Sequence, residues 1–165
     1  MGEPRSRRSA RLELELAAED RPARLLAELR AGADVSDERF DRLFPAELRQ
    51  RSARHWTPAA VARRAVELLA PRPDWEILDI GSGAGKLCIL GALLSPASFV
   101  GVEQELLLVG AAQSAARAAY ATRARFVHGS AFDLDWTRFH GVYLFNPFGE
   151  LLAAGAHERS GDEKA

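Results

Sequence analysis

The stretch Ile77-Leu78-Asp79-Ile80-Gly81-Ser82-Gly83-Ala84-Gly85-Lys86-Leu87 decides the fold that this sequence predicts. Residues 75–80 are mostly apolar and partly β-branched, and two prolines precede them, which predicts a buried strand. Three glycines follow at alternate positions, and the apolar segment that begins at Lys86 is long enough for a helix. Glycines allow a sharp turn and a close approach to a ligand, and a helix N-terminus presents unpaired N–H groups. The stretch therefore predicts a cradle for a ligand.

The bulk composition is that of one globular domain. The chain has 165 residues, of which 47% are hydrophobic and 27% charged. Because the net charge is −1, no global field recruits nucleic acid. Arginines nevertheless cluster at the start of the chain and before the first strand, where they form either solvated helix faces or a basic rim near RNA or DNA. These arginines are Arg5, Arg7, Arg8, Arg11, Arg49, Arg51, Arg54, Arg63 and Arg64.

Cysteine content and hydropathy favour a cytoplasmic protein. Cys88 is the only cysteine, which excludes an intrachain disulfide and fits a reducing compartment. No apolar run approaches the ~18 residues needed to cross a membrane, and the N-terminal arginines lack the apolar core of a signal peptide. We expect neither a membrane segment nor a metal site.

The chain divides into four expected parts. Residues 1–11 are basic and predicted to be disordered, residues 12–53 to form an α-helical extension, 54–150 the main domain, and 151–165 a polar tail. Within the extension, Pro22 interrupts a helical pattern, and Ser36 is a candidate cap for a second helix.

The main domain alternates helices with strands. Thr57 is the expected N-cap and Pro58 the first residue of a helix that runs to about Ala70. Further strands are predicted at 98–103, 125–128 and 141–145, and helices at 86–94 and 106–121. Such alternation predicts a parallel sheet with helices on both faces, with ligands bound at the carboxyl ends of its strands. Glu103 and the loops 128–133 and 146–150 fall at that edge.

The glycine turn is compatible with three kinds of nucleotide-like ligand. A phosphate-binding P-loop would have a hydroxyl residue after Lys86 and a glycine at position 80, and both are missing. The dinucleotide fingerprint of an NAD-dependent oxidoreductase would have a glycine at position 86, so that it fits only with Gly85 as a shifted third glycine. The third pattern is Asp-x-Gly-x-Gly-x-Gly, followed by Glu103 at the end of the second strand.

Over residues 54–150 the sequence resembles class I S-adenosylmethionine-dependent methyltransferases. The resemblance rests on four segments in the right order and spacing: 78–86, 100–103, 126–131 and 145–149. It implies a Rossmann-like α/β fold, S-adenosyl-L-methionine as the cofactor, and methyl transfer to an unidentified acceptor.

The resemblance also implies roles for individual residues. Glu103 would bind the ribose hydroxyls, and Asp79 with the glycine turn the ammonium of the methionine part. The loop after the third strand would hold the adenine, and the segment before the first strand would close over the methionine end. The implied cofactor contacts are Trp56, Thr57, Asp79, Gly81, Ser82, Gly83, Gly85, Glu103, Ser130, Ala131 and Phe132. Structural alternatives remain for three of them: a turn hydrogen bond for Asp79, a solvated strand end for Glu103, and a packing role for Trp56.

Asn146, Pro147 and Phe148 resemble the substrate loop of the amino-group methyltransferases in this family. There, an asparagine or aspartate accepts hydrogen bonds from the target nitrogen and an aromatic ring stacks on the acceptor, so that catalysis is mostly positioning. The acceptor is then a nitrogen of a protein or a nucleic acid. The family pattern has two prolines where this chain has one, and a rigid turn after the strand is the alternative.

The family's sheet has seven strands, and the sequence accounts for about four. The strand 141–145 would therefore form an open parallel edge, which favours self-association or pairing with a partner. We expect a truncated product, a fragment completed by a partner or a second copy, or a minimal cofactor-binding module. A methyltransferase is the main hypothesis, a non-catalytic binding or interaction module the first alternative, and an NAD-dependent oxidoreductase the second.

Overall fold

The computed structural model describes residues 22–50, 56–70 and 72–145. The predictions for the basic N-terminus, the polar tail and the substrate loop Asn146, Pro147 and Phe148 lie outside these residues.

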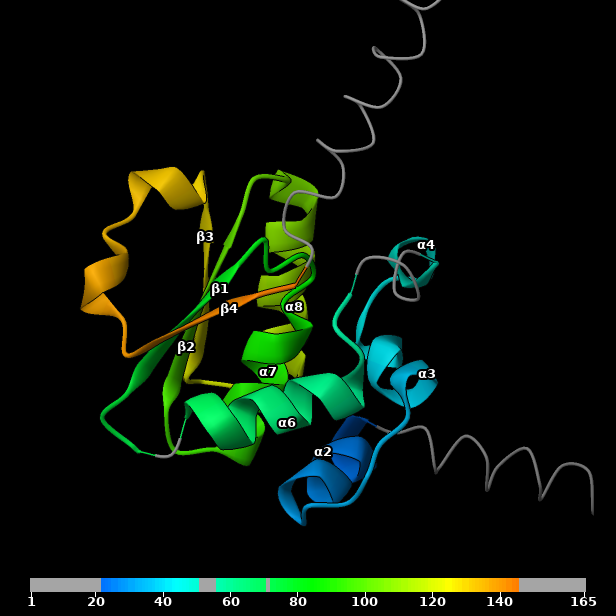
Figure 1. The fold of residues 1–165 in the computed structure, drawn as a ribbon. Coiled ribbons are helices and arrows are strands. Elements are labelled where there is room, and N and C mark those ends of the chain that lie inside the picture. The colour runs from blue at the N-terminus through cyan, green and yellow to red at the C-terminus, as the bar shows by residue number, and fades with distance from the viewer. Residues whose placement is uncertain (1–21, 51–55, 71, 146–165) are drawn as a thin grey trace, which may run out of the picture.

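The core of the structure is a four-stranded parallel sheet (Figure 1). Its strands are β1 (Glu76–Ile80), β2 (Ser98–Glu103), β3 (Ala124–His128) and β4 (Gly141–Leu144), in the spatial order β3-β2-β1-β4. Strand β1 lies between β2 and β4 and pairs with both, so that Asp79 is next to Gly101 on one side and Tyr143 on the other. The expected parallel α/β fold is confirmed, and its carboxyl edge gathers the loops that follow β1, β2 and β3.

Three helices pack on one face of the sheet: α6 (Ala59–Leu69), α7 (Lys86–Leu94) and α8 (Leu106–Ala118) (Figure 1). Helix α7 is apolar around its circumference and is almost wholly buried, because it lies between α6, α8 and the sheet. It approaches β2 closely, since a Cβ on Gly91 would come within 2.3 Å of the Phe99 ring. The glycine turn is thus attached to the most buried helix of the domain.

The opposite face of the sheet carries two short 3-10 helices, η2 (Ala131–Asp133) and η3 (Trp136–Arg138). Alternation along the strands directs Leu78, Ile80, Val100 and Val102 toward this face, where they form a second core cluster. The segment between β3 and β4 covers them with the partly buried side chains of Leu134, Trp136 and Phe139.

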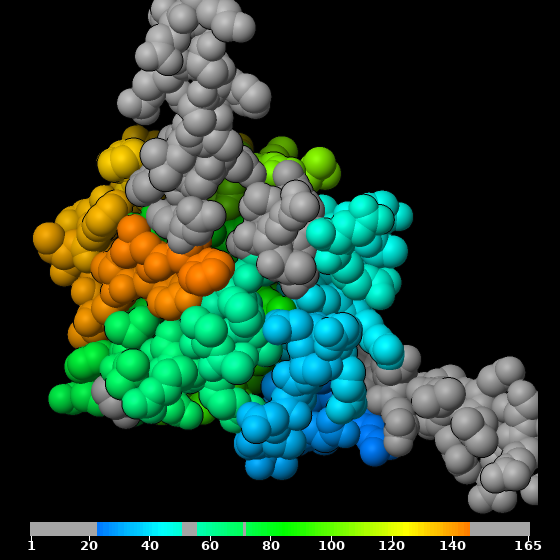
Figure 2. Space-filling model, turned by 45° about the vertical axis from the view of Figure 1, so that its right-hand side comes forward, coloured from blue at the N-terminus to red at the C-terminus, as the bar shows by residue number. Residues whose placement is uncertain are grey.

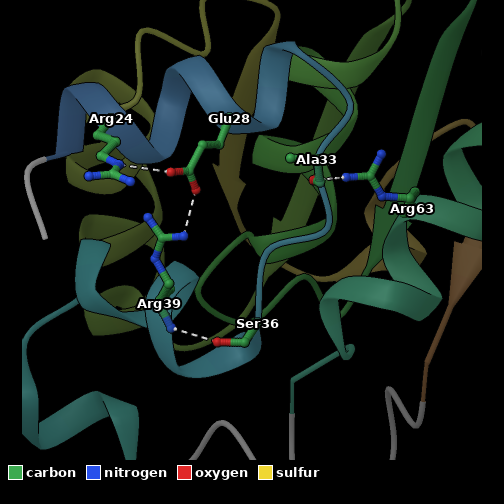
Figure 3. A network of polar contacts seen from close by, with 6 residues as sticks. All are labelled: Arg24, Glu28, Ala33, Ser36, Arg39 and Arg63. Carbon is green, nitrogen blue, oxygen red and sulfur yellow. Dashed lines mark hydrogen bonds and ion pairs between the residues drawn. The ribbon is translucent and has the colours of Figure 1, made fainter. Parts of the chain in front are cut away.

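The extension consists of α2 (Pro22–Arg30), α3 (Asp37–Phe40), the 3-10 helix η1 (Asp41–Leu43) and α4 (Ala46–Arg49). It packs against α7, is joined to α6 by hydrogen bonds, and adds its apolar side chains to the main core; the extension, blue to cyan, lies beside the green α6 in Figure 2. Polar contacts hold its parts together: Glu28 pairs with Arg24 and Arg39, while Arg63 of α6 donates a 2.5 Å hydrogen bond to the Ala33 carbonyl (Figure 3).

One expectation about a helix start is corrected and one is confirmed. Ser36 caps α3 as predicted, accepting from the Arg39 N–H. Pro22 is the first described residue of α2, a position that suits proline because it has no N–H to lose in a first turn. Thr57 is not the cap of α6: Pro58 holds that position, and the Ala59 N–H donates instead to the Asp37 carboxylate at 2.8 Å. The boundaries of the other predicted elements differ by at most three residues.

Candidate functional site

The glycine turn connects the end of β1 to α7 in a backbone conformation that L side chains rarely adopt. Gly81, Gly83 and Gly85 have φ angles of 68°, 55° and 80°. The N–H groups of Gly81 and Ser82 donate to the Val102 carbonyl at 3.0 Å, which fastens the turn to the end of β2. A Cβ on Gly85 would lie 2.3 Å from the Phe126 ring, so this position also lacks the space for a side chain.

Glu103, the last residue of β2, is hydrogen-bonded to the glycine turn. Its Oε2 accepts from the Gly83 N–H at 2.9 Å, and its Oε1 accepts from the N–H groups of Gln104 and Glu105 at 2.7 and 2.9 Å. Three of roughly four acceptor positions on the carboxylate are therefore used by the backbone. This carboxylate is held in place beside the turn, with capacity for a ligand hydroxyl.

Asp79 is 4% exposed and lies on the helix-covered side of β1. Its Oδ2 is 3.6 Å from the Cys88 Sγ in the first turn of α7. The pKa of the Asp79 carboxyl is raised to about 7, chiefly by burial; the Cys88 thiol lowers it and the negative charge of Glu103 raises it. The carboxyl ends of β1 and β2 thus carry two carboxyl groups close enough to repel each other when both are ionised.

Lys86 does not face a ligand in the turn. Its side chain is 3% exposed and points into the extension, where the ammonium binds the carboxylates of Asp37 and Asp41. The Phe40 ring lies 5.6 Å from its Nζ. Since the lysine of a phosphate-binding loop must reach the phosphates, this orientation argues against that hypothesis.

Trp56 lies beside the turn, where the resemblance places the segment before the first strand. The Cβ position of Gly83 is 3.7 Å from the Trp56 ring, and Phe44 of the extension packs edge-on against the same ring at 4.7 Å between centroids. Trp56 is 6% and Thr57 8% exposed. Packing against Phe44 therefore buries part of the Trp56 ring, and one edge of the ring faces the turn at Gly83.

Tyr143 is a site residue that the sequence did not single out. It is next to Asp79 in the register of β1 and β4. Burial raises the pKa of Tyr143, as does the neighbouring Asp79. The pairing of β1 with β4 brings Tyr143 beside Asp79. The alternation of residues along β4 does not by itself predict which strand it pairs with.

The loop after β3 lies beside the loop after β2. The Gly129 N–H donates to the Glu103 carbonyl at 3.0 Å, and His128 Nε2 is 3.0 Å from the Gln104 carbonyl. Ser130 caps η2 by accepting from the Phe132 N–H at 3.2 Å. Ala131 is buried, whereas Phe132 is 75% exposed.

These residues fit a cofactor with a ribose and a positive charge. Glu103 and Asp79 are acids at the ends of neighbouring strands, and the Ser82 Oγ is buried with no hydrogen-bond partner among the described residues. Pyrophosphate would meet repulsion from the two acids, with the nearby lysine directed elsewhere. The described residues contain no group of His, Cys, Asp and Glu side chains that could hold a metal, and no described helix is long and apolar enough to span a membrane.

No family model and no curated protein sequence matches the chain. Solved structures do match it. An RNA methyltransferase from Salinibacter ruber in complex with S-adenosyl-L-homocysteine is 32% identical, over 53% of this chain and 58% of that one, with a TM-score of 0.49. A precorrin-6y C5,15-methyltransferase from Geobacter metallireducens is 20% identical, over 59% of this chain and 54% of that one, with a TM-score of 0.51.

An O-methyltransferase from Bacillus cereus in complex with SAH is also 20% identical, over 60% of this chain and 52% of that one, with a TM-score of 0.50. The chain thus spans between 52% and 58% of the length of these three structures. The precorrin methyltransferase and the O-methyltransferase share the sheet and helices of this chain. Their sequence identity of 20% supports a shared fold and nothing beyond it. On the part that the structure describes, the chain therefore has the Rossmann-like fold of S-adenosylmethionine-dependent methyltransferases.

Proposed function

We propose that this chain binds S-adenosyl-L-methionine at the glycine turn and transfers its methyl group to an acceptor. The observation that carries the proposal is the pair of acids, Asp79 and Glu103, that flanks the turn while Lys86 is buried elsewhere. A cofactor with an ammonium and a sulfonium relieves the repulsion between these acids, whereas a cofactor with two phosphates adds to it.

Each part of the cofactor has a complementary group in the site. Glu103 accepts from a ribose hydroxyl with the one acceptor position that its backbone bonds leave. Asp79 and the turn Gly81–Gly85 hold the methionine ammonium, and Trp56 and Thr57 cover that end. Ser130, Ala131 and the exposed Phe132 ring hold the adenine. Ser82 supplies a hydroxyl that is buried and unpartnered among the described residues.

The bound cofactor supplies a methyl group activated by its positive sulfur. The residues of the chain then have to orient that group and exclude water, because methyl transfer to a suitably placed lone pair is mostly a matter of positioning. Asn146, Pro147 and Phe148, which lie outside the described residues, are proposed to hold the acceptor. We propose a nitrogen of a protein or a nucleic acid as that acceptor.

The alternatives predict different binding results. Calorimetric titration with S-adenosylhomocysteine and with NAD separates them: we expect binding of S-adenosylhomocysteine and no response to NAD. Binding of NAD alone would establish the oxidoreductase alternative. Cofactor binding without transfer of tritiated methyl to protein, RNA or DNA would favour the non-catalytic module.

Glu103→Ala tests the site itself. We expect it to weaken S-adenosylhomocysteine binding by roughly tenfold to a hundredfold, since hydrogen bonds to a charged group contribute about 1.5–3 kcal/mol each. Glu76→Ala is the control, because Glu76 is also an acid of the sheet but lies at the amino end of β1, away from the glycine turn, where it pairs with Arg125. Equal affinities of the two variants would refute the ribose role.

A further inference from the structure

Lys86 is the residue of the glycine turn segment that cofactor binding does not explain. It directly follows Gly85, yet its ammonium is enclosed by two carboxylates and an aromatic ring of the extension. Asp41 binds it at 2.8 Å and is itself only 7% exposed, while Asp37 binds it from the more open side. Buried charges are expensive unless they are paired, so this cluster requires the extension to be docked on α7.

The two aspartates differ in one contact. Asp37 Oδ1 also accepts the N–H of Ala59, the first residue of α6, at 2.8 Å. The same carboxylate thereby joins the first residue of α6 to the first residue of α7. Within this cluster, and among the described residues, the Asp41 carboxylate binds only Lys86.

The segments fixed by Asp37 are the two that border the methionine end of the site. Ala59 follows Trp56, Thr57 and Pro58, and Lys86 follows the glycine turn. Trp56 is packed between Gly83 of the turn and Phe44 of the extension, and Phe44 in turn packs on Phe40 at 6.0 Å. The spacing between the Trp56 segment and the turn is therefore set from within the extension.

We propose that Asp37 is a positioning residue for the cofactor site, which it serves by holding Trp56 and Thr57 at a fixed distance from the glycine turn through Ala59 and Lys86. This inference rests on the proposed binding of S-adenosylmethionine. It gives the extension a role in function: residues 22–50 complete the wall of the site that the methionine part occupies.

The test compares Asp37→Ala with Asp41→Ala, using S-adenosylhomocysteine and 5′-methylthioadenosine, which lacks the amino acid part. Each substitution leaves Lys86 with one carboxylate, but only Asp37→Ala breaks the bridge to α6. We expect Asp37→Ala to weaken S-adenosylhomocysteine binding roughly tenfold, and methylthioadenosine binding by no more than about twofold. Asp41→Ala should leave both affinities within about twofold, although it truncates the more buried residue.

Each outcome bears on the inference. Equal weakening by the two variants, or equal weakening of both ligands by Asp37→Ala, would show a general loss of stability and overturn it. Unchanged binding by Asp37→Ala would overturn it as well, and leave the proposed function intact. A wild-type chain that binds neither ligand would refute the proposed function and this inference with it. If Asp37→Ala does not fold, Asp37→Asn replaces it with an expected weakening of roughly threefold for S-adenosylhomocysteine alone.

Discussion

The buried Asp79 carboxyl should make the stability of this protein fall between weakly acidic and neutral pH. Its ordinary pKa is 3.8, and burial raises it to about 7 in the folded chain. The folded state then binds the proton more tightly than the unfolded state does. The contribution of Asp79 to the free energy of unfolding is fully present below about pH 4 and is lost as the pH rises to about 7. Above about pH 7 this contribution no longer changes with pH.

The size of the effect follows from the two pKa values. At about 1.36 kcal/mol per pH unit, the interval from 3.8 to about 7 corresponds to about 4 kcal/mol, of which roughly 3 kcal/mol is lost between pH 5 and pH 8. Asp79→Asn keeps the shape of the side chain and removes the titration. The free energy of unfolding of the wild type, minus that of Asp79→Asn, should therefore decrease by roughly 3 kcal/mol over this range.

Urea denaturation at pH 5, 6, 7 and 8 measures this difference, and the subtraction removes the contribution of all other titrating groups. Cys88→Ala adds a second measurement: without the thiol that lowers the pKa of Asp79, the decrease should extend to higher pH. Parallel stability curves for the wild type and Asp79→Asn would refute the reasoning. If an ammonium binds beside Asp79, the affinity for S-adenosylhomocysteine should also rise with pH in the wild type and not in Asp79→Asn.

Two further predictions concern the turn and the sheet edge. Gly85→Ala should lower the free energy of unfolding by about 3 kcal/mol, because φ is 80° and the new Cβ would meet Phe126 at 2.3 Å. Gly110→Ala in α8, where a Cβ meets nothing, should stabilise slightly, and equal losses in urea denaturation would contradict this account. At the edge, β4 carries Leu144 with 47% exposure and has no charged residue. Leu144→Lys should reduce concentration-dependent association in sedimentation velocity, whereas Leu68→Lys, an equally apolar exposed site on α6, should not; identical behaviour would argue against pairing at β4.

The architecture of the sheet could be predicted because its signals are local. Hydrophobic segments of strand length alternate with longer apolar segments, and a polypeptide with that alternation forms parallel strands joined by helices. The glycine turn was recognisable for the same reason: three glycines at alternate positions mark a backbone that side chains would obstruct, and the positive φ angles bear this out. Glu103 also followed from position alone, as the acid that ends the second strand beside the turn.

Side-chain partners could not be predicted, because they join residues far apart in the chain. Residue type and position predict Thr57 as the N-cap of a helix. In the structure the Ala59 N–H donates its hydrogen bond to the carboxylate of Asp37, which lies in α3. The residues around Lys86 already argue against a phosphate-binding loop, but only the docking of the extension shows that two aspartates bind its ammonium. Tyr143 lies beside Asp79 because β4 pairs with β1.

The sequence by itself thus determined the order of strands and helices, the glycine turn and the acid beside it, since these depend on neighbouring residues and on backbone freedom. Only the tertiary structure decided how deeply Asp79 is buried, where the Lys86 charge lies and which residues complete the wall beside Trp56. Burial and ion pairing depend on how the extension, α6 and α7 pack together, and no local pattern in the chain encodes that packing.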